Sequence, residues 1–183
     1  LFGTALFEED TMVGTLNGDE TRYMLMAKGD FKRGFFTIQD PKKPELIVDL
    51  DIMASKKPEI KVTFDGMKPI IHLCIRLDAD ILTIQSDVDY EKPELKGLLE
   101  KEFQQIVKNE TAKVIRKCQS LNADVFMFGD HATKNFSTIN DLENYNWNSH
   151  FKDAKIMIEV KVGIRRTGTK IGIYTTRDSK KDD

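Results

Sequence analysis

The sequence predicts an α+β fold, with a mostly antiparallel sheet and one long helix and shorter helices packed on one face. Three observations favour this class. Segments of the first half alternate apolar and polar residues with the period of two that strands require. Residues 93–121 repeat apolar side chains at steps of three and four, as an amphipathic helix does. Residues 154–166 alternate again, so a strand returns after the helical part.

The helix expected over residues 93–121 organises the rest of the chain. Pro93 and Glu94 suit a first turn, where no amide donor is needed and the helix dipole favours an acid. With a rise of about 1.5 Å per residue, the helix would be on the order of 43 Å long and could cross a small sheet. Its single apolar stripe predicts one sheet to cover and consists of Leu95, Leu98, Leu99, Phe103, Ile106, Val107, Val114, Ile115, Cys118 and Leu121.

One acid interrupts this stripe. Glu110 falls in phase with the apolar residues, between Ile106 and Val114. Two explanations are open: the helix overruns the sheet at this point, or Glu110 is a buried partner of an arginine.

The chain is expected to open with a hairpin of two short strands, residues 2–7 and 11–16. A helix follows from Asn17, because Asn17 and Glu20 have the spacing of a capping box. Gly29 is a suitable end for this helix.

Four more strands are expected before the long helix, near residues 34–39, 45–53, 59–64 and 69–86. The last is the longest, and its alternation places one face on the core and one face in water. A bulge or bend is expected beyond Asp80, where the alternation loosens. The predicted core face carries Ile71, Leu73, Ile75, Leu77 and Ala79, and the polar face carries His72, Cys74, Arg76, Asp78 and Asp80.

Helical segments are predicted after the long helix at residues 123–136, 138–145 and 147–151. The returning strand, residues 154–166, is predicted to bury Ile156, Ile158, Val160, Val162 and Ile164. Arg166 is in phase with this face but lies at the strand end, where its long side chain can reach water.

Residues 1–168 are expected to form a single domain. Residues 169–176 could add one more strand, and residues 177–183 are expected to be a disordered, charged tail. The sequence starts with Leu1 and is strand-like at once, which suggests a fragment of a longer protein.

The composition excludes several classes of protein. The 183 residues include 28 basic and 30 acidic side chains, a net charge of −2, so nothing favours binding to nucleic acid or to an anionic membrane surface. No apolar run is long enough for a transmembrane helix, and no signal peptide is present.

The sequence predicts no catalytic, cofactor-binding or metal-binding residues. His72 and Cys74 could ligate a metal together, but two ligands do not make a site. Asp130 and His131 are neighbours that point in different directions on a helix, and they are expected at the surface. Cys118 is expected to be a small buried hydrophobe.

Two further patterns are excluded. Residues 87–91 begin like a calcium loop, but Lys92 and Leu98 stand where such a loop needs Gly and Glu, so an acidic turn is expected. No glycine pattern for phosphate binding occurs. A hydrolase would need a histidine within hydrogen-bond reach of a Ser, Cys or carboxylate.

Both ends of the chain resemble one family, the last domain of the spore germination receptor C subunits, or Ger(x)C lipoproteins. The resemblance covers residues 3–168. The residues that carry it are Gly3-x-Ala5-x-Phe7, Asp10-x-Met12-Val13-Gly14-x-Leu16-Asn17-x-x-Glu20-Thr21-Arg22, Asp124-Val125-Phe126-x-Phe128-Gly129, Trp147 with Phe151, and Val160-x-Val162-x-Ile164-Arg165-Arg166-Thr167-Gly168.

This resemblance implies a non-enzymatic, soluble domain of a lipoprotein. An N-terminal lipid anchor, absent from this fragment, would hold the parent on the outer face of the spore inner membrane. The partners would be the membrane A and B subunits of the germinant receptor, in nutrient-triggered germination.

Two functions follow as hypotheses. The first is a scaffold or interaction module, with Trp147, Arg165 and Arg166 as the expected partner contact, since Trp and Arg are favoured interface anchors. The alternative is a module that binds the germinant itself, which requires a concave pocket with a few convergent polar groups. An apolar cleft between the long helix and the sheet, near Glu110, would favour this alternative.

Overall fold

The computed structural model describes residues 2–8 and 10–166, so the predictions for residues 169–176 and 177–183 lie outside the described residues. The chain begins with a hairpin and a helix, β1 (Gly3–Glu8), β2 (Thr11–Asn17) and α1 (Gly18–Lys28). The sheet strands that follow are β3 (Arg33–Gln39), β4 (Ile47–Ala54), β5 (Glu59–Asp65), β6 (Lys68–Ile84) and, last in the chain, β7 (Lys155–Arg166). Between β6 and β7 lie α2 (Pro93–Ser120), α3 (Phe128–Ala132), the 3-10 turn η1 (Thr133–Asn135), α4 (Ile139–Tyr145) and α5 (Trp147–Phe151).

The 17-residue strand β6 is the centre of the sheet. On one of its edges, the first half pairs with β5 and the second half with β4, and β3 extends the sheet beyond β4; all these pairs are antiparallel. On the other edge β6 pairs with β7 in parallel. The predicted α+β class with a mostly antiparallel sheet is therefore confirmed, with this one parallel pair added.

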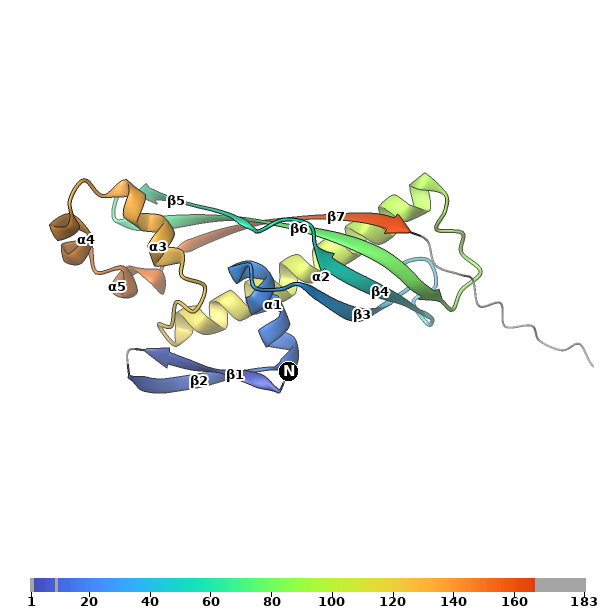
Figure 1. Ribbon diagram of the computed structural model, residues 1–183, viewed down its shortest axis with the longest axis horizontal. Coiled ribbons are helices and arrows are strands. Elements are labelled where there is room, and N and C mark those ends of the chain that lie inside the picture. The colour runs from blue at the N-terminus through green and yellow to red at the C-terminus, as the bar shows by residue number, and fades with distance from the viewer. Residues whose placement is uncertain (1, 9, 167–183) are drawn as a thin grey trace, which may run out of the picture.

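The parallel pair follows from the path of the chain. After β6 ends, α2 runs back along the sheet, and α3, α4 and α5 gather at the end where β6 began (Figure 1). From there β7 starts in the same direction as β6. Parallel neighbours need such a crossover, and here the long helix provides it.

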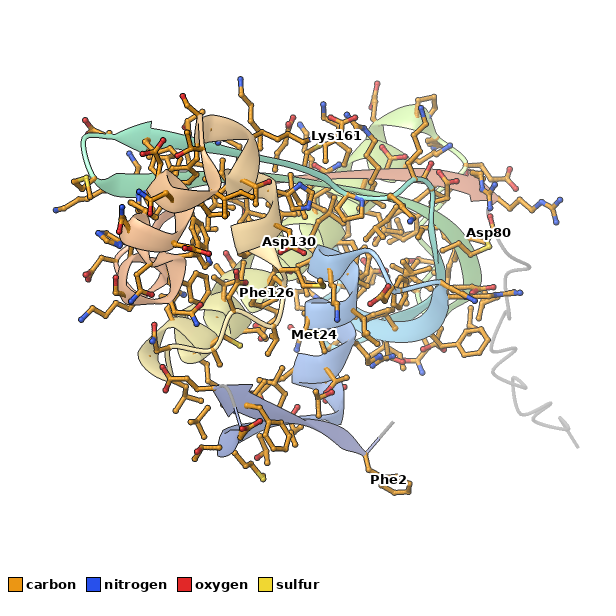
Figure 2. All side chains as sticks on the ribbon, turned by 60° about the vertical axis from the view of Figure 1, so that its left-hand side comes forward. Phe2, Met24, Asp80, Phe126, Asp130 and Lys161 are labelled. Carbon is orange, nitrogen blue, oxygen red and sulfur yellow. The ribbon has the colours of Figure 1, made fainter. Side chains whose placement is uncertain are left out.

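The core lies between α2 and one face of the sheet. The predicted alternation of β6 is confirmed, because Ile71, Leu73 and Ile75 are buried while their neighbours on the other face remain partly exposed. The predicted stripe of α2 is confirmed as well, although Thr111, not Glu110, continues it at the centre of the helix. Figure 2 shows the side chains of the helices and strands filling this layer, with Lys161 on the opposite side of the sheet.

Glu110 itself lies at the border of the core. Its carboxylate is half-exposed and pairs with Lys113 at 2.6 Å. Of the two explanations left open by the sequence, the buried arginine pair is therefore wrong.

Helix α1 begins as the sequence predicts. The Asn17 side chain accepts a hydrogen bond from the Glu20 amide at 2.8 Å, and the Glu20 carboxylate accepts one from the Asn17 amide at 2.8 Å. Gly29 ends the helix with a φ of 91°, a left-handed conformation that glycine adopts without strain.

The single helix predicted for residues 123–136 is wrong. The chain instead makes tight turns up to Met127, which has a left-handed φ of 61°, and only then forms α3 and η1. The Asp124 carboxylate accepts hydrogen bonds from the amides of Phe128 and Gly129, at 3.2 and 2.9 Å. These bonds satisfy the amides that begin α3. The helix can therefore start late without leaving these amide donors unpaired.

The predicted irregularity of β6 is present. Thr83 pairs with Asp49 and Ile81 with Leu50, so Leu82 is an extra residue relative to β4. Pairing with β7 also shifts, between Ala79 and Asp80. Such bulges bend a long strand and increase its twist.

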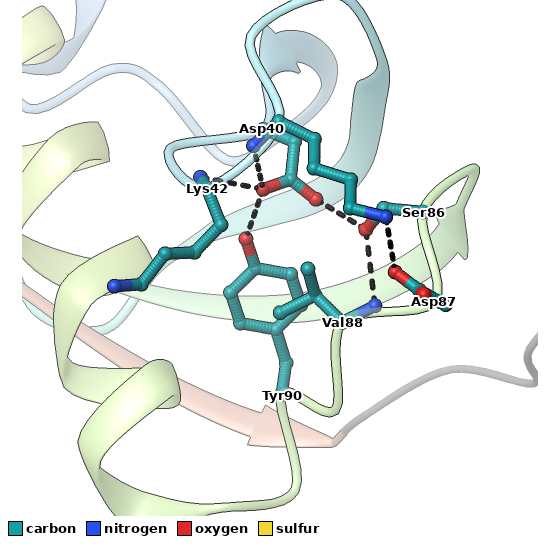
Figure 3. A network of polar contacts seen from close by, with 7 residues as sticks. Asp40, Lys42, Ser86, Asp87, Val88 and Tyr90 are labelled. Atoms are coloured by element: carbon teal, nitrogen blue, oxygen red, sulfur yellow. Dashed lines mark hydrogen bonds and ion pairs between the residues drawn. The ribbon is translucent and has the colours of Figure 1, made fainter.

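A buried aspartate connects the loop after β3 to the loop before α2 (Figure 3). The Asp40 carboxylate accepts hydrogen bonds from the hydroxyl groups of Tyr90, at 2.6 Å, and Ser86. It also accepts bonds from the amides of Lys42 and Lys43, at 2.8 and 3.2 Å. Because Tyr90 lies three residues before α2, this cluster fixes where the long helix enters the fold.

Burial and hydrogen bonding act in opposite directions on Asp40. Burial alone would raise the pKa of its carboxyl, but the hydrogen bonds from Ser86, Tyr90 and the two amides outweigh it, so the pKa lies below the ordinary value of 3.8. Burial and the neighbouring Asp40 raise the pKa of Tyr90, which keeps its hydroxyl protonated as the donor. Ionised Asp40 therefore stabilises the fold at neutral pH.

We expect Asp40→Asn to lower the free energy of unfolding at pH 7 by about 2 kcal/mol, because an amide cannot accept all four hydrogen bonds. The folded-state pKa is below 3.8, so the contribution of the carboxylate is present above that pH and is lost as the pH falls through the lowered pKa. Urea unfolding of both proteins over a range of pH measures the difference. Exposed Asp65 provides the control, Asp65→Asn, and equal stabilities of Asp40→Asn and the parent chain at pH 7 would contradict this role.

Candidate interaction surface

The described residues contain no group of three or more His, Cys, Asp or Glu side chains that could hold a metal ion. Two histidines lie near a hydroxyl: His72 Nε2 is 3.3 Å from Thr63 Oγ1 on the neighbouring strand, and His150 Nδ1 is 3.0 Å from Ser149 Oγ. However, Ser149 Oγ donates to the Asn146 carbonyl at 2.8 Å, and both side chains are adjacent in a one-turn helix. This contact is a local helix-turn interaction and lacks the oriented base that a nucleophilic serine needs.

His72 and Cys74 lie, as expected, on the polar face of β6. They border a shallow hollow of 340 Å³ with Glu59, Met157 and Glu159 from the neighbouring strands. Burial raises the pKa of the Cys74 thiol, so the thiolate that reacts or binds metal is disfavoured. For Cys118, burial raises the pKa to about 12, which fits the predicted role of a small buried hydrophobe.

Trp147 is part of the fold. Its indole N–H donates to the Asp124 carboxylate at 2.8 Å, and its ring stacks on Phe151. A Cβ on Gly129 would come within 2.8 Å of the Trp147 ring, so a glycine is needed there. Burial raises the pKa of Asp124, and the bonds from Gly129, Phe128 and Trp147 act against this shift.

Arg165 and Arg166 lie at the other end of the sheet from Trp147. Trp147 begins α5, just before β7 starts, whereas the arginines end that strand (Figure 1). The 12 residues of β7 span roughly 36 Å. The structure therefore does not bring the three expected contact residues together, and the prediction that the arginines lie near Trp147 is wrong. This separation follows from the extended strand that the sequence predicts over residues 154–166, because the two ends of such a strand lie far apart.

Both arginines are exposed. The Arg165 guanidinium lies 3.5 Å from Asp78 on β6, and it also contacts the sulfur of Met53 on β4 at 3.6 Å. Such an exposed ion pair contributes little to stability. The two side chains are therefore available without cost to the fold.

The sheet face opposite α2 carries paired charges. Glu59 and Arg76 are 2.6 Å apart, and Glu159 and Lys161 are 3.1 Å apart. The hydrogen bond from Arg76 lowers the pKa of Glu59, and the one from Lys161 lowers the pKa of Glu159. At the β3 and β4 end of this face, Arg33 binds Asp51 through two guanidinium nitrogens. Two large apolar side chains, Phe35 and Met157, lie exposed among these charges.

We call this face the outer face. Its side chains come from alternate positions of β3, β4, β5, β6 and β7 and include Arg33, Phe35, Asp51, Glu59, Arg76, Asp78, Met157, Glu159 and Lys161. Charged pairs around exposed aromatic and methionine side chains resemble the mixture of polar rim and apolar anchors in protein interfaces. The sequence predicted the polar faces of β6 and β7. That Arg33, Phe35 and Asp51 join the same face depends on strand order, which the alternation of apolar and polar residues does not encode.

Comparison with known proteins assigns the family. The family described as "Spore germination B3/ GerAC like, C-terminal" matches residues 2–168. Among solved structures, the chain is similar to the GerBC protein, with a TM-score of 0.69 and 18% sequence identity. That match covers 85% of this chain and 48% of GerBC, so the chain spans about half the length of that protein. No curated protein sequence matches the chain significantly.

The fold is thus that of a C-terminal domain from a spore germination protein. The chain belongs to the spore germination B3/GerAC-like family, which confirms the resemblance to germinant receptor C subunits seen in the sequence. Within its described residues, no helix combines the length and the hydropathy that a membrane span requires.

We expect Trp147→Phe to lower the free energy of unfolding by about 1–3 kcal/mol, because the half-buried Asp124 carboxylate loses a donor. Arg166→Ala, an exposed change, should alter it by less than about 0.5 kcal/mol. Chemical unfolding followed by circular dichroism measures both. Equal stability of Trp147→Phe and the parent chain would show that the fold does not need this bond, and Trp147 would again be a candidate partner contact.

Proposed function

We propose that this chain is a non-enzymatic interaction domain of a germinant receptor lipoprotein subunit. Its task is to bind other subunits of the receptor and so to support nutrient-triggered germination. The proposal rests on the outer face of the sheet, which no element of residues 2–8 and 10–166 covers, in a domain of this family. The described residues also offer no constellation of nucleophile, base and orienting group.

The proposed partners are the membrane A and B subunits. In this proposal the parent protein is held by an N-terminal lipid anchor at the outer face of the spore inner membrane. The domain would then stand beside the extracytoplasmic parts of the two membrane subunits. Arg165 and Arg166, at the border of the outer face, are the proposed contacts.

Binding of a germinant by this domain is the weaker candidate. The cleft between α2 and the sheet that would favour this candidate is not open among the described residues, because Leu99, Phe103 and Val107 are buried there. Isothermal titration of the chain with amino acids, sugars and nucleosides tests this candidate. A saturable signal with any of these compounds would favour the germinant-binding alternative.

We expect Arg165→Ala/Arg166→Ala to weaken assembly with the A and B subunits by about tenfold, because arginine side chains are frequent hot spots of interfaces. Copurification of the tagged chain with coexpressed A and B subunits measures this effect. The matched control is Lys42→Ala/Lys57→Ala, which removes the same charge from exposed loops outside the outer face.

Stability should be the same for both double variants, within about 0.5 kcal/mol. Unchanged assembly of Arg165→Ala/Arg166→Ala would remove these residues from the interface. Failure of the parent chain to associate with either subunit would overturn the proposed function itself.

A further inference from the structure

Strand β7 forms a border of the sheet, and one of its edges faces away from β6. The amide of Ile164 donates to the Glu100 carboxylate of α2 at 2.8 Å, and Gln104 of α2 donates to the Val162 carbonyl at 3.5 Å. The Ile164 N–H and the Val162 C=O therefore point outward. In a strand, the N–H and C=O of one residue point to the same edge, and this edge alternates from residue to residue, so the N–H and C=O of Ile156, Ile158 and Val160 face the same outer edge.

The edge is closed at one end and open along the rest. Glu100 and Gln104 occupy its C-terminal end, around Val162 and Ile164. In the described part of the chain, no hydrogen bond reaches the outward groups of Ile156, Ile158 or Val160. Five residues, 156–160, thus present an unpaired strand edge of roughly 13 Å.

A groove follows this open edge. It has a volume of 390 Å³ and lies between β7 and α2, with Ile158, Glu159 and Val160 on the strand side. The α2 side consists of Lys101, Gln104, Gln105 and Lys108. The strand thus supplies backbone donors and acceptors, and the helix supplies side chains beside them, which is the layout of sites that add a β-strand from a partner.

The positive charge of the groove favours an acidic binding segment. Lys101 and Lys108 are exposed and have no acidic partner within the described residues, whereas Glu159 is already paired with Lys161. An incoming strand with acidic side chains toward α2 would neutralise the two lysines. A second copy of this chain would bring two lysine-lined edges together, and like charges oppose that pairing.

We propose that the β7 edge, residues 156–160, is a docking site for an extended, acidic segment of another receptor subunit, which adds as a strand beside β7 under α2. This inference rests on the proposed function and specifies the chemistry of the partner. Backbone hydrogen bonds to Ile156, Ile158 and Val160 provide the binding, and Lys101 and Lys108 provide the preference for acid.

Residue-resolved amide exchange of the chain, alone and in the complex with coexpressed A and B subunits, tests the proposal. We expect the amides of Ile158 and Val160 to exchange about tenfold more slowly in the complex. Those of Met157 and Glu159 point toward β6 and should change little. This alternation is specific to strand addition, because general shielding would slow neighbouring amides alike.

Charge reversal provides the second measurement. Lys101→Glu/Lys108→Glu should reduce copurification with the receptor subunits about tenfold and remove its salt dependence. The control Lys42→Glu/Lys57→Glu makes the same change in net charge on exposed loops and should have no effect. Circular dichroism and urea unfolding of the free chain check that both variants fold.

The outcomes separate the two proposals. Assembly without slower exchange at Ile158 and Val160 overturns the edge inference and leaves the proposed function standing. Failure to assemble overturns both. The same protection in a dimer of this chain alone would identify a second copy as the occupant and overturn the acidic partner. Faster exchange of the Ile158 and Val160 amides after removal of residues 169–183 would identify the chain's own C-terminal segment as the occupant. This result would also overturn the acidic partner.

Discussion

The burial of one stripe of α2 against β6 and β7 is the constraint on which the rest of the domain depends. The helix is held at both ends by polar contacts. At its start, the Asp40 carboxylate binds Tyr90, three residues before α2. At its end, Lys117 pairs with Glu20 of α1 at 2.7 Å, and Gln119 donates to the carbonyls of Phe151 and Ala154, both at 2.9 Å. Helix α2 therefore also fixes the position of α1, which follows the β1–β2 hairpin, and the start of β7.

This arrangement assigns separate roles to the two faces of the sheet. The inner face is used entirely for the core, including the path that makes β7 parallel to β6. Buried Asp40 and half-buried Asp124 accept hydrogen bonds from backbone amides and from side chains, and these bonds fix loops, so neither is available for chemistry on a substrate. What faces outward is the charged outer face and the partly open edge of β7, and these are features with which proteins bind proteins.

Much of this fold could be predicted from local patterns. The capping box of Asn17 and Glu20, the alternation of β6 and the stripe of α2 depend only on spacing along the chain, and the structure confirms them. Local patterns failed where a distant group decides the backbone. The segment after α2 has helical composition, but Asp124 accepts the amides that start α3, so the helix begins only at Phe128.

The candidate interaction surface was harder to predict from the sequence, again because residues that are distant in the sequence decide the local structure. Trp147, expected as a partner contact, is held by Asp124, and the bond between them joins residues 23 positions apart. The edge of β7 could not be predicted, because it exists only once strand order and direction are set. Likewise, Tyr90 looked like part of an acidic turn, and its partner Asp40 lies 50 residues away.

We propose that the domain binds its partners through the outer face of its sheet. Carboxylate labelling followed by mass spectrometry tests this most directly, in the free chain and in the assembled receptor. We expect Glu59, Asp78 and Glu159 on the outer face to lose reactivity on assembly, while exposed Asp19 and Asp30 near α1 keep theirs. Unchanged labelling of the outer face, with protection of Asp19 and Asp30 instead, would contradict it.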